Sequence, residues 1–329
     1  MLSRKVLILG IDCLDYYLIR KWRLKPYILD CCGYHYVGTD LYTPVIWAKF
    51  LTGVDVSTYG FDSRKILKVK RIKSLYYLYD FFKYLQKITD EKIMPFLKKE
   101  LLKQVNTSPY VSSSIIKKAF LKFIISDSHE DLRISEKILL RLLQKASQVE
   151  RLPKKLMKKT FVHFAIRRGL RVMPIEFPPI NDNIYSLIRI MLYFYIGSPV
   201  YERQIFLNYA WELTKITLDL LLKKLEEYDL ILWYTPYIDI ASHMFYKPKS
   251  LRYMLKLYTA YRKLGNEIEK VVSKVYNDTI VLIVSDHGYN PARQDHSYFG
   301  YWSINLNLTN TEKPRTILDF EHLIRRLIS

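Results

Sequence analysis

The sequence predicts an α/β protein in which helices flank a mostly parallel central sheet. Short apolar runs of strand length alternate along the chain with longer segments whose apolar residues recur at helical spacing. The runs at 5–12 and 280–284 are apolar almost throughout, as expected for strands buried on both faces of a parallel sheet. With 329 residues and 50% hydrophobic content, the chain is long enough to bury a sizeable core.

The predicted strands are few and short. They fall at residues 5–12, about 35–39, 169–177, 229–235 and 280–284. A further segment after His296 is interpreted as an edge hairpin or strand. Because most of these strands are separated by helical segments, we expect them to be parallel.

Helical periodicity fills the rest of the chain. A helix is expected to begin at Thr43 and Pro44, with Thr43 as its N-cap, and to end at Gly53. A Lys/Leu-rich region at about 86–165 has few strand signals and is interpreted as a helical insert or cap within a single domain, 1–329. Further helices are predicted at 75–85, 206–228, 249–276 and from about 316.

The net charge of +20 comes from 52 Lys and Arg against 32 Asp and Glu. It favours polyanionic partners such as phosphate esters, nucleotides, nucleic acid or an anionic membrane surface. Lys-rich helices that merely keep a thermally robust protein in solution explain it equally well. Both interpretations stay open from composition alone.

Cysteine usage and the N-terminus bear on location. Three cysteines, Cys13, Cys31 and Cys32, form no CxxC motif and are odd in number, which argues against a disulfide framework or a zinc ribbon. The first apolar run leads into an acidic loop without a cleavage site, and no later run is long enough to span a bilayer. We therefore expect a cytoplasmic protein without membrane insertion.

Potential metal ligands lie where the predicted strands end. Asp286 and His287 follow the strand at 280–284, and His296 comes nine residues after His287. These side chains fall at the carboxyl edge of the predicted parallel sheet, which is where open α/β proteins bind small molecules and ions. Asp239 and His243, four residues apart, fall on one side of a helical turn.

The remaining two candidates come from the first part of the chain. Asp12 ends the first strand, where an acidic residue on its own is most often a cap or turn residue. Thr43 is either a simple helix cap or a hydroxyl nucleophile activated by metal at a helix N-terminus. Six ligands and one hydroxyl are what a two-metal phosphoryl-transfer site needs.

Five motifs resemble the type I phosphodiesterase/nucleotide pyrophosphatase family of the alkaline phosphatase superfamily. They are GID at 10–12, T-P-x-x-W-x-x-F-x-T-G at 43–53, D-x-x-x-H at 239–243, SDHG at 285–288 and HS at 296–297. They occur in the family's order and span most of the chain, although the segment at about 89–161 is not covered. The resemblance implies an alkaline-phosphatase-like three-layer sandwich with a helical insert.

The resemblance also implies roles for individual residues. Asp239, His243 and His296 would hold one zinc ion, and Asp12, Asp286 and His287 the other. Thr43 would contact the second ion and attack phosphorus, giving a phosphothreonine intermediate that is then hydrolysed. All-Asp/His sites also bind manganese or iron, so the identity of the two divalent ions stays open.

Two positions depart from the family's pattern. Where many relatives have His-Gly after the nucleophile helix, this chain has Tyr59 and Gly60. Where eukaryotic relatives place an Asn that binds a phosphate oxygen, the count from Thr43 reaches Arg64. Arg64 would contact a non-bridging oxygen, or it is simply solvated if the loop lengths differ.

The expected function is therefore metal-dependent hydrolysis of a small phosphoester or nucleotide, most simply a diester or pyrophosphate. A phosphomonoesterase or phosphonate hydrolase of the same superfamily is the first alternative. A basic nucleic-acid-binding protein on an inactive hydrolase scaffold is the second, which the complete ligand set argues against; no stable nucleic acid partner is expected. The oligomeric state and the natural substrate cannot be derived from the sequence.

Overall fold

The computed structural model describes residues 5–70, 150–182 and 184–329. Its centre is a six-stranded sheet with the order β2-β8-β5-β1-β4-β3. The bounds of its strands are β1 Lys5–Ile11, β2 Cys31–Tyr36, β3 Val172–Ile175, β4 Leu230–Thr235, β5 Thr279–Val284 and β8 Phe299–Ile304. A separate two-stranded ribbon pairs β6 Tyr289–Asn290 with β7 Asp295–His296. The α/β class predicted from the sequence is confirmed.

Four neighbouring strands of the sheet are parallel. β1 lies between β5 and β4, and β3 pairs with the other side of β4. β8 is antiparallel to both β5 and β2, so β2 runs in the same direction as β5. β4 and β5 are buried along their whole length because helices cover both faces of the sheet.

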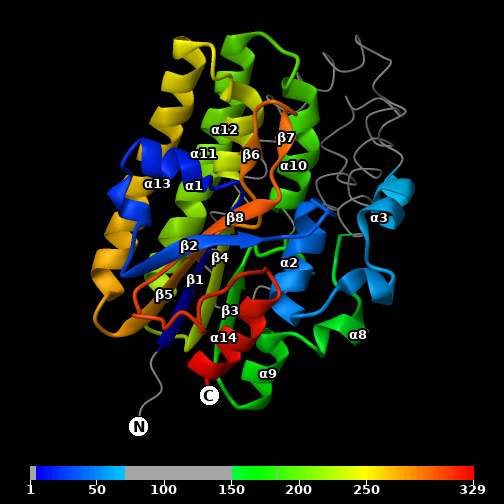
Figure 1. Cartoon of the computed structure of the whole chain (residues 1–329), viewed down its shortest axis with the longest axis vertical. Coiled ribbons are helices and arrows are strands. Elements are labelled where there is room, and N and C mark those ends of the chain that lie inside the picture. Colours follow the sequence, from blue (N-terminus) through cyan, green and yellow to red (C-terminus); the bar gives the residue numbers. More distant parts are fainter. Residues whose placement is uncertain (1–4, 71–149, 183) are drawn as a thin grey trace, which may run out of the picture.

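The helices form two groups, one on each face. Of the helices described, α10 Ile184–Tyr195, α11 Val200–Lys224, α12 Tyr237–Phe245 and α13 Leu251–Val275 pack with one another, and α11 and α13 contact β4 and β5. The second group is α2 Thr43–Thr52, α9 Phe161–Arg167 and α14 Asp319–Leu327. In Figure 1, α13 runs along the left side of the view from the top to below its middle, α2 lies to the right of the strands, and α9 and α14 lie at the bottom. This is the predicted three-layer sandwich.

Shorter elements complete the described chain. They are α1 Tyr16–Lys21, the 3-10 turns η1 Lys25–Tyr27 and η2 Val56–Tyr59, α3 Ser63–Lys70, and α8 Lys154–Met157. The predicted helix at 75–85 and most of the predicted insert at about 86–165 lie outside the described residues. No helix among the described residues is long and apolar enough to cross a membrane.

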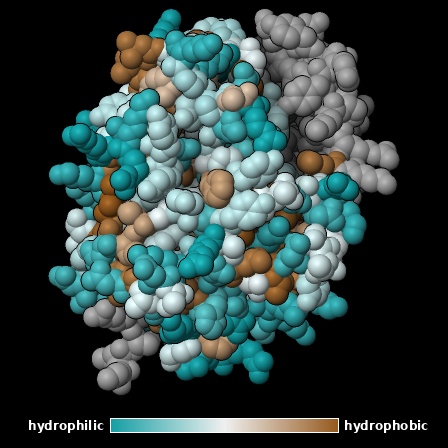
Figure 2. Space-filling view, viewed as in Figure 1, coloured by the Kyte–Doolittle hydropathy of each residue, from teal (hydrophilic) through white to brown (hydrophobic). Residues whose placement is uncertain are grey.

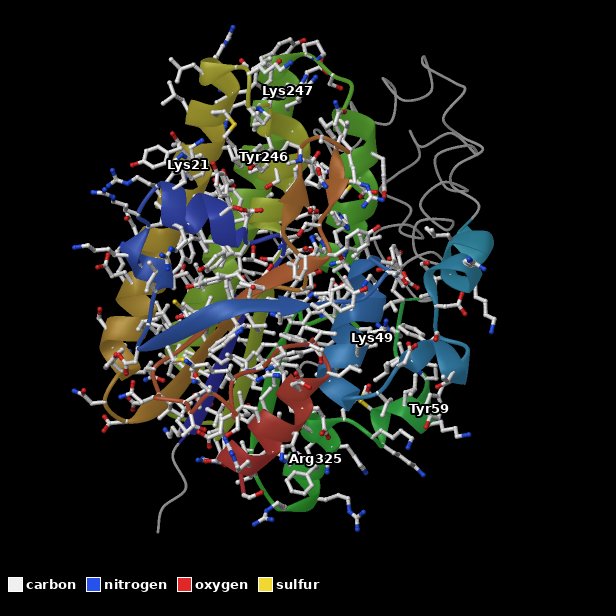
Figure 3. The ribbon with its side chains drawn as sticks, viewed as in Figure 1. Lys21, Lys49, Tyr59, Tyr246, Lys247 and Arg325 are labelled. Carbon is white, nitrogen blue, oxygen red and sulfur yellow. The ribbon has the colours of Figure 1, made fainter. Side chains whose placement is uncertain are left out.

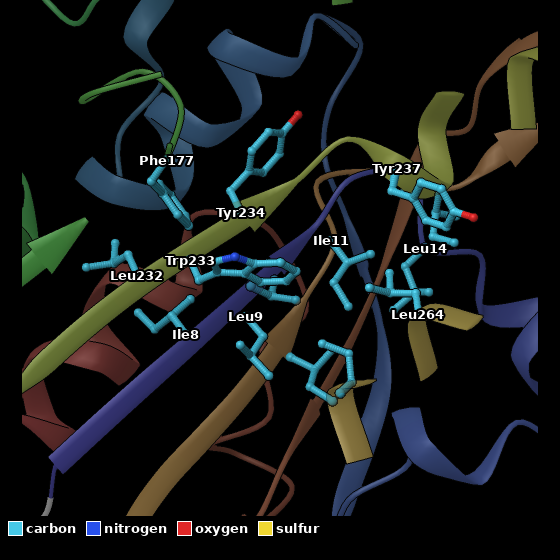
Figure 4. Packing of buried hydrophobic residues seen from close by; sticks show 14 of the residues in the cluster. Ile8, Leu9, Ile11, Leu14, Phe177, Leu232, Trp233, Tyr234, Tyr237 and Leu264 are labelled. Atoms are coloured by element: carbon cyan, nitrogen blue, oxygen red, sulfur yellow. The ribbon is translucent and has the colours of Figure 1, made fainter. Parts of the chain in front are cut away.

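Side chains on β4 alternate between the two faces, as they must in an extended strand. Trp233 turns toward α11, where its indole Nε1–H donates to Thr217 Oγ1 at 3.0 Å. Tyr234 turns to the opposite side of β4, toward Phe177 and Trp47. Figure 4 shows Trp233 and Tyr234 on these opposite sides. The sheet is therefore packed against aromatic rings on both faces, which fixes its position relative to α2.

Charged side chains lie mainly at the surface. On the face seen in Figure 2, hydrophilic residues predominate and hydrophobic ones are scattered in small groups. Figure 3 shows Lys21 and Lys247 at the periphery together with Tyr59, and all three are exposed. Lys155 and Lys159 extend over the ring of Tyr59, with Nζ 5.6 and 5.4 Å from its centroid.

Three sequence expectations about elements were wrong. The segment after His296 is not an edge strand: β8 lies inside the sheet, between β2 and β5. The second strand begins at Cys31 and ends before Val37, because its ladder with β8 runs from Cys31 to Tyr36. The third correction concerns α2, whose N-cap is Tyr42 and not Thr43. The carbonyl of Tyr42 accepts the first helical N–H groups, from Val45 and Ile46.

Candidate active site

Four strands deliver side chains to one edge of the sheet. Because β1, β4 and β5 are parallel neighbours, their carboxyl ends meet there. Asp12 follows β1 directly, Asp286 comes shortly after β5, and Asp239 lies in the first turn of α12 after β4. β2 runs in the same direction as β5, so the chain that leaves it brings Thr43 to the same edge.

The first ligand group consists of Asp239, His243 and His296. Asp239 and His243 lie one turn apart on α12, and His243 Nε2 is 3.3 Å from Asp239 Oδ1. The ribbon β6–β7 brings His296 back over the edge, with Nε2 3.6 Å from the same oxygen and 3.1 Å from His243 Nε2. Two imidazole nitrogens and one carboxylate oxygen thus converge on one point, as ligands of a single ion do.

The second group consists of Asp12, Asp286 and His287, all fully buried. His287 Nε2 lies 3.2 Å from Asp12 Oδ1 and 3.3 Å from Asp286 Oδ2. The two groups adjoin, because the rings of His287 and His296 stack with centroids 3.6 Å apart. Two ligand sets in contact are the arrangement that a two-ion centre requires.

Backbone carbonyls fix the orientation of two imidazoles. His287 Nδ1 is 3.1 Å from Gly288 O, and His296 Nδ1 is 2.9 Å from Leu41 O. Since a carbonyl oxygen only accepts, each Nδ1 donates its proton to it, and each ring turns Nε2 toward the carboxylates. A lone pair facing carboxylate oxygens is stable only when a cation or a proton lies between them.

The carboxylates also fit bound cations. Among the described residues, Asp12 Oδ1, Asp239 Oδ1 and Asp286 Oδ2 are buried without a hydrogen-bond partner. Burying a charged oxygen without a hydrogen-bond partner costs on the order of several kcal/mol, and a bound divalent ion would reduce that cost. The oxygen and nitrogen donors suit zinc, manganese or iron. The donor set therefore fits the metal centre that the sequence predicts.

Burial and neighbouring charges shift the pKa values of the acidic groups and of His296. Burial, followed by the charge of Asp239, raises the pKa of Asp12 to about 6. Burial and then the charge of Asp12 raise the pKa of Asp286 well above its usual value. Burial would lower the pKa of His296, but Asp239 outweighs it and raises the pKa to about 9. Burial would raise the pKa of Asp239, but His243 and His296 outweigh it and lower that pKa well below its usual value. Without cations the centre thus tends to hold protons on Asp286 and His296, which divalent ions would replace.

Thr43 lies beside the second group. It occupies the first turn of α2, is 5% exposed, and its Oγ1 is 3.4 Å from His287 Nε2. The N-terminus of a helix favours negative charge. Pro44 has no N–H and the N–H of Val45 bonds to Tyr42 O, so the N–H of Thr43 is the nearest backbone donor left by the helix. The hydroxyl is thus placed where an anionic phosphoryl group would meet both the ligands and the helix.

A buried ionic network extends from the second group. Tyr234 donates its hydroxyl proton to Asp12 Oδ2 and accepts from Arg189 Nη1 at 3.1 Å. Arg189 also pairs with Asp182 and, at 3.1 Å, with Glu150. The hydroxyl of Tyr42, next to Thr43, donates to Glu150. The network therefore connects a candidate metal ligand with the helix that carries Thr43.

The structure gathers seven of the eight candidate residues at this edge. They are Asp12, Thr43, Asp239, His243, Asp286, His287 and His296. Arg64 lies on α3 with an exposed side chain, and its contact with a substrate oxygen stays a prediction. Tyr59 is likewise exposed, so the departure at 59–60 lies at the surface.

Sequence reasoning missed the network around Arg189. One signal was available: Arg189 is the single charged residue in α10, IYSLIRIMLYFY. A lone cation in an apolar helix needs a buried partner, which predicts carboxylates nearby. Tyr234 gave no comparable signal, because an aromatic residue is ordinary in a buried strand.

Comparisons with known proteins bear on the family that this chain resembles. Residues 154–314 match the family model of the type I phosphodiesterases / nucleotide pyrophosphatases. The match covers slightly less than half of the chain and is to the family that the sequence motifs resemble. Members of this family are phosphoester hydrolases, and the six-stranded sheet with helices on both faces is consistent with an alkaline-phosphatase-like fold.

The family match includes only some of the candidate site residues. It contains Asp239, His243, Asp286, His287 and His296, whereas Asp12 and Thr43 lie before it. A comparison with curated proteins finds no match. The structure of the PH0037 protein from Pyrococcus horikoshii aligns over 100% of this chain and 98% of its own, with 12% identity and a TM-score of 0.43.

Proposed function

We propose that this phosphoester hydrolase is a two-metal phosphodiesterase or nucleotide pyrophosphatase with Thr43 as nucleophile. The observation that carries the proposal is a pair of adjoining Asp/His groups with Thr43 beside the second one, its Oγ1 3.4 Å from His287 Nε2. Asp239, His243 and His296 would hold one divalent ion, and Asp12, Asp286 and His287 the other. Zinc is the ion we expect, with manganese or iron as the alternatives.

When bound, the ions supply positive charge for the transferring phosphoryl group and lower the pKa of a coordinated hydroxyl. Residues of the chain would supply the nucleophile and a backbone hydrogen-bond donor. Thr43 presents its hydroxyl at the helix N-terminus, and its N–H is available to a developing oxyanion. Attack of Thr43 Oγ1 on phosphorus would form the O–P bond as the bond to the leaving alcohol or phosphate breaks, and the proton released from the hydroxyl would go to solvent or to the leaving group. Water then cleaves the phosphothreonine and restores the hydroxyl.

The charge around the centre favours a diester over a monoester. Arg189, buried beside the centre, is already paired with Asp182 and Glu150. Its charge is thus largely neutralised, and it adds little to the binding of a dianionic monoester. A diester or pyrophosphate carries less charge on the attacked phosphorus, so the ions and the helix N-terminus suffice for it.

The test compares bis-p-nitrophenyl phosphate with p-nitrophenyl phosphate after the metal is stripped and zinc is returned. We expect zinc-restored diesterase activity in the wild type, and a loss of at least about 1,000-fold in Thr43→Ala. Thr43→Ser, which keeps a hydroxyl, is the matched control and is expected to retain measurable activity. Metal content is measured in all three proteins to separate loss of the nucleophile from loss of the ions.

The other outcomes point to the alternatives. Faster turnover of the monoester would favour a phosphomonoesterase or phosphonate hydrolase on the same centre. No turnover of either ester with zinc, manganese or iron would contradict the proposed function. Salt-sensitive binding of nucleic acid by the inactive protein would then support the scaffold hypothesis.

A further inference from the structure

Cys13 lies between the two ligand groups. Its Sγ, a carboxylate oxygen of Asp239 and a ring nitrogen of His287 all lie within 4.8 Å of one another. Asp239 belongs to the first group and His287 to the second. The thiol is therefore the one side chain outside the six Asp/His candidates that forms a metal-binding set with members of both groups, within the described residues.

The surroundings of this sulfur are polar and closed to solvent. Cys13 is fully buried, and Asp239 is 4% exposed with Oδ1 lacking a hydrogen-bond partner among the described residues. Ser242 Oγ, on the same helix as Asp239, is likewise buried without a hydrogen-bond partner among the described residues. Asp239, whose carboxylate belongs to the set around the thiol, thus has one oxygen without a hydrogen-bond partner, and a cation would provide that partner.

The backbone at Cys13 is held in a conformation that favours glycine. Its φ is 61°, which costs about 1 kcal/mol for a residue with a Cβ. Its N–H donates to Asp286 Oδ1 at 3.4 Å, and its carbonyl accepts from the Tyr261 hydroxyl at 3.3 Å. These contacts tie the position of the residue to the ligand Asp286.

A buried free cysteine usually acts as a small apolar residue. Cys13 does border the hydrophobic core, but it also lies beside a carboxylate and an imidazole, Asp239 and His287, which a purely apolar role does not explain. Tetrahedral zinc with nitrogen and sulfur ligands places those ligands about 3.5 Å apart, so small side-chain movements would bring all three onto one ion. The thiol is thus close enough to serve as a ligand.

We propose that Cys13 is a seventh ligand of the metal centre and makes it prefer thiophilic ions, namely zinc, cobalt and cadmium, over manganese and magnesium. The proposal rests on the proposed two-metal function. On binding, the S–H bond breaks, a sulfur–metal bond forms, and the proton leaves to solvent. Thiolate ligands select softer ions, whereas carboxylates suit magnesium and manganese.

The first test uses cobalt as a spectroscopic probe on the full chain. Metal-free protein is titrated with Co²⁺, and its absorption is followed in the near ultraviolet, where a thiolate bound to cobalt gives an intense charge-transfer band. We expect the band in the wild type and its absence in Cys13→Ser. The double variant Cys31→Ser/Cys32→Ser is the matched control: it removes the other two thiols, at the opposite end of β2, and is expected to keep the band.

The second test compares ion preference by isothermal titration with Cd²⁺ and Mn²⁺. In Cys13→Ser and Cys13→Ala we expect cadmium affinity to fall by about 10-fold or more, as for the loss of other metal-site partners, while manganese affinity changes little. Circular dichroism checks that both variants are folded.

The outcomes separate the two proposals. Cobalt uptake with weak ligand-field bands but no thiolate band in the wild type would overturn the role of Cys13 and leave the metal centre standing. An equal loss of cadmium and manganese affinity in both variants would assign Cys13 a structural role only. No uptake of any ion would contradict both this inference and the proposed function.

Discussion

At the scale of single residues, the centre depends on side chains that orient the candidate ligands. Gly288 O and Leu41 O hold two imidazoles, and the Tyr234 hydroxyl donates to the Asp12 oxygen that faces away from His287. Such partners fix a ligand's direction and its basicity, and their loss weakens metal binding even though the ligand remains. Tyr234 is the one that a minimal substitution can test.

Tyr234→Phe removes this hydroxyl without changing the packing of the ring. We expect zinc affinity to fall about 10- to 100-fold, because Asp12 loses the hydrogen bond that holds it. Tyr185→Phe is the matched control, since Tyr185 also has a buried hydroxyl, 3.0 Å from Thr217 Oγ1 and not bonded to a candidate ligand. Zinc titration of both variants checks the prediction, and an equal loss in the two would contradict it.

At the scale of elements, α2 carries the nucleophile and depends on how it ends. Gly53 follows the helix with φ 65°, and its N–H bonds back to Lys49 O. A Cβ at this position would lie 2.9 Å from Glu321 Cβ on α14. The end of α2 and the start of α14 can therefore approach only because residue 53 is glycine.

Gly53→Ala is expected to lower the free energy of unfolding by about 2–3 kcal/mol, from left-handed strain plus displacement of α14. Gly169→Ala isolates the strain: Gly169 has φ 79°, and a Cβ there meets nothing within 4 Å. We expect about 1 kcal/mol for it. Urea unfolding of the two variants measures the difference, and equal losses would show that contact with α14 contributes nothing.

At the scale of the whole molecule, the sheet brings together ligands that are far apart in the sequence. Asp12 and Asp286 follow adjacent parallel strands.

The sheet also buries a histidine that is not one of the candidate ligands. This residue, His35, lies on β2, next to β8. Its ring packs edge-on against Phe320, with centroids 4.9 Å apart. Burial lowers the pKa of His35 to about 3, from an ordinary value of 6.5.

This shift makes the stability of the chain depend on pH. Below pH 6.5 the unfolded chain binds a proton at His35 that the folded chain does not bind until about pH 3. As the pH is lowered from 6.5 to about 3, His35 therefore lowers the free energy of unfolding by about 1.4 kcal/mol per pH unit. His35→Leu, which keeps an apolar side chain against Phe320, is expected to lose this slope. Denaturant unfolding from pH 7.5 to 4 measures it, and parallel curves for both proteins would contradict the assignment.

The sequence predicted well where one local pattern decides the outcome. The buried runs at β1, β4 and β5 are apolar throughout, and the spacing of Asp239 and His243 places both on one side of any helix. It did less well where pairing partners decide. β8 lies inside the sheet because of what pairs on each side of it, and neither partner is near it in sequence. The N-cap of α2 moved to Tyr42 because its carbonyl, and not a side chain, begins the helix.

The sequence by itself determined the α/β class, the family resemblance and the seven ligand and nucleophile candidates, because residue types and short spacings carry that chemistry. Only the tertiary structure decided how the candidates meet. It brought the two ligand sets that the resemblance implies into contact, placed Arg189 and Tyr234 behind Asp12, and brought Cys13 between the groups. Most of these contacts join segments far apart in the sequence, 222 residues in the case of Asp12 and Tyr234, and they follow from the order and direction of strands, which no local pattern encodes.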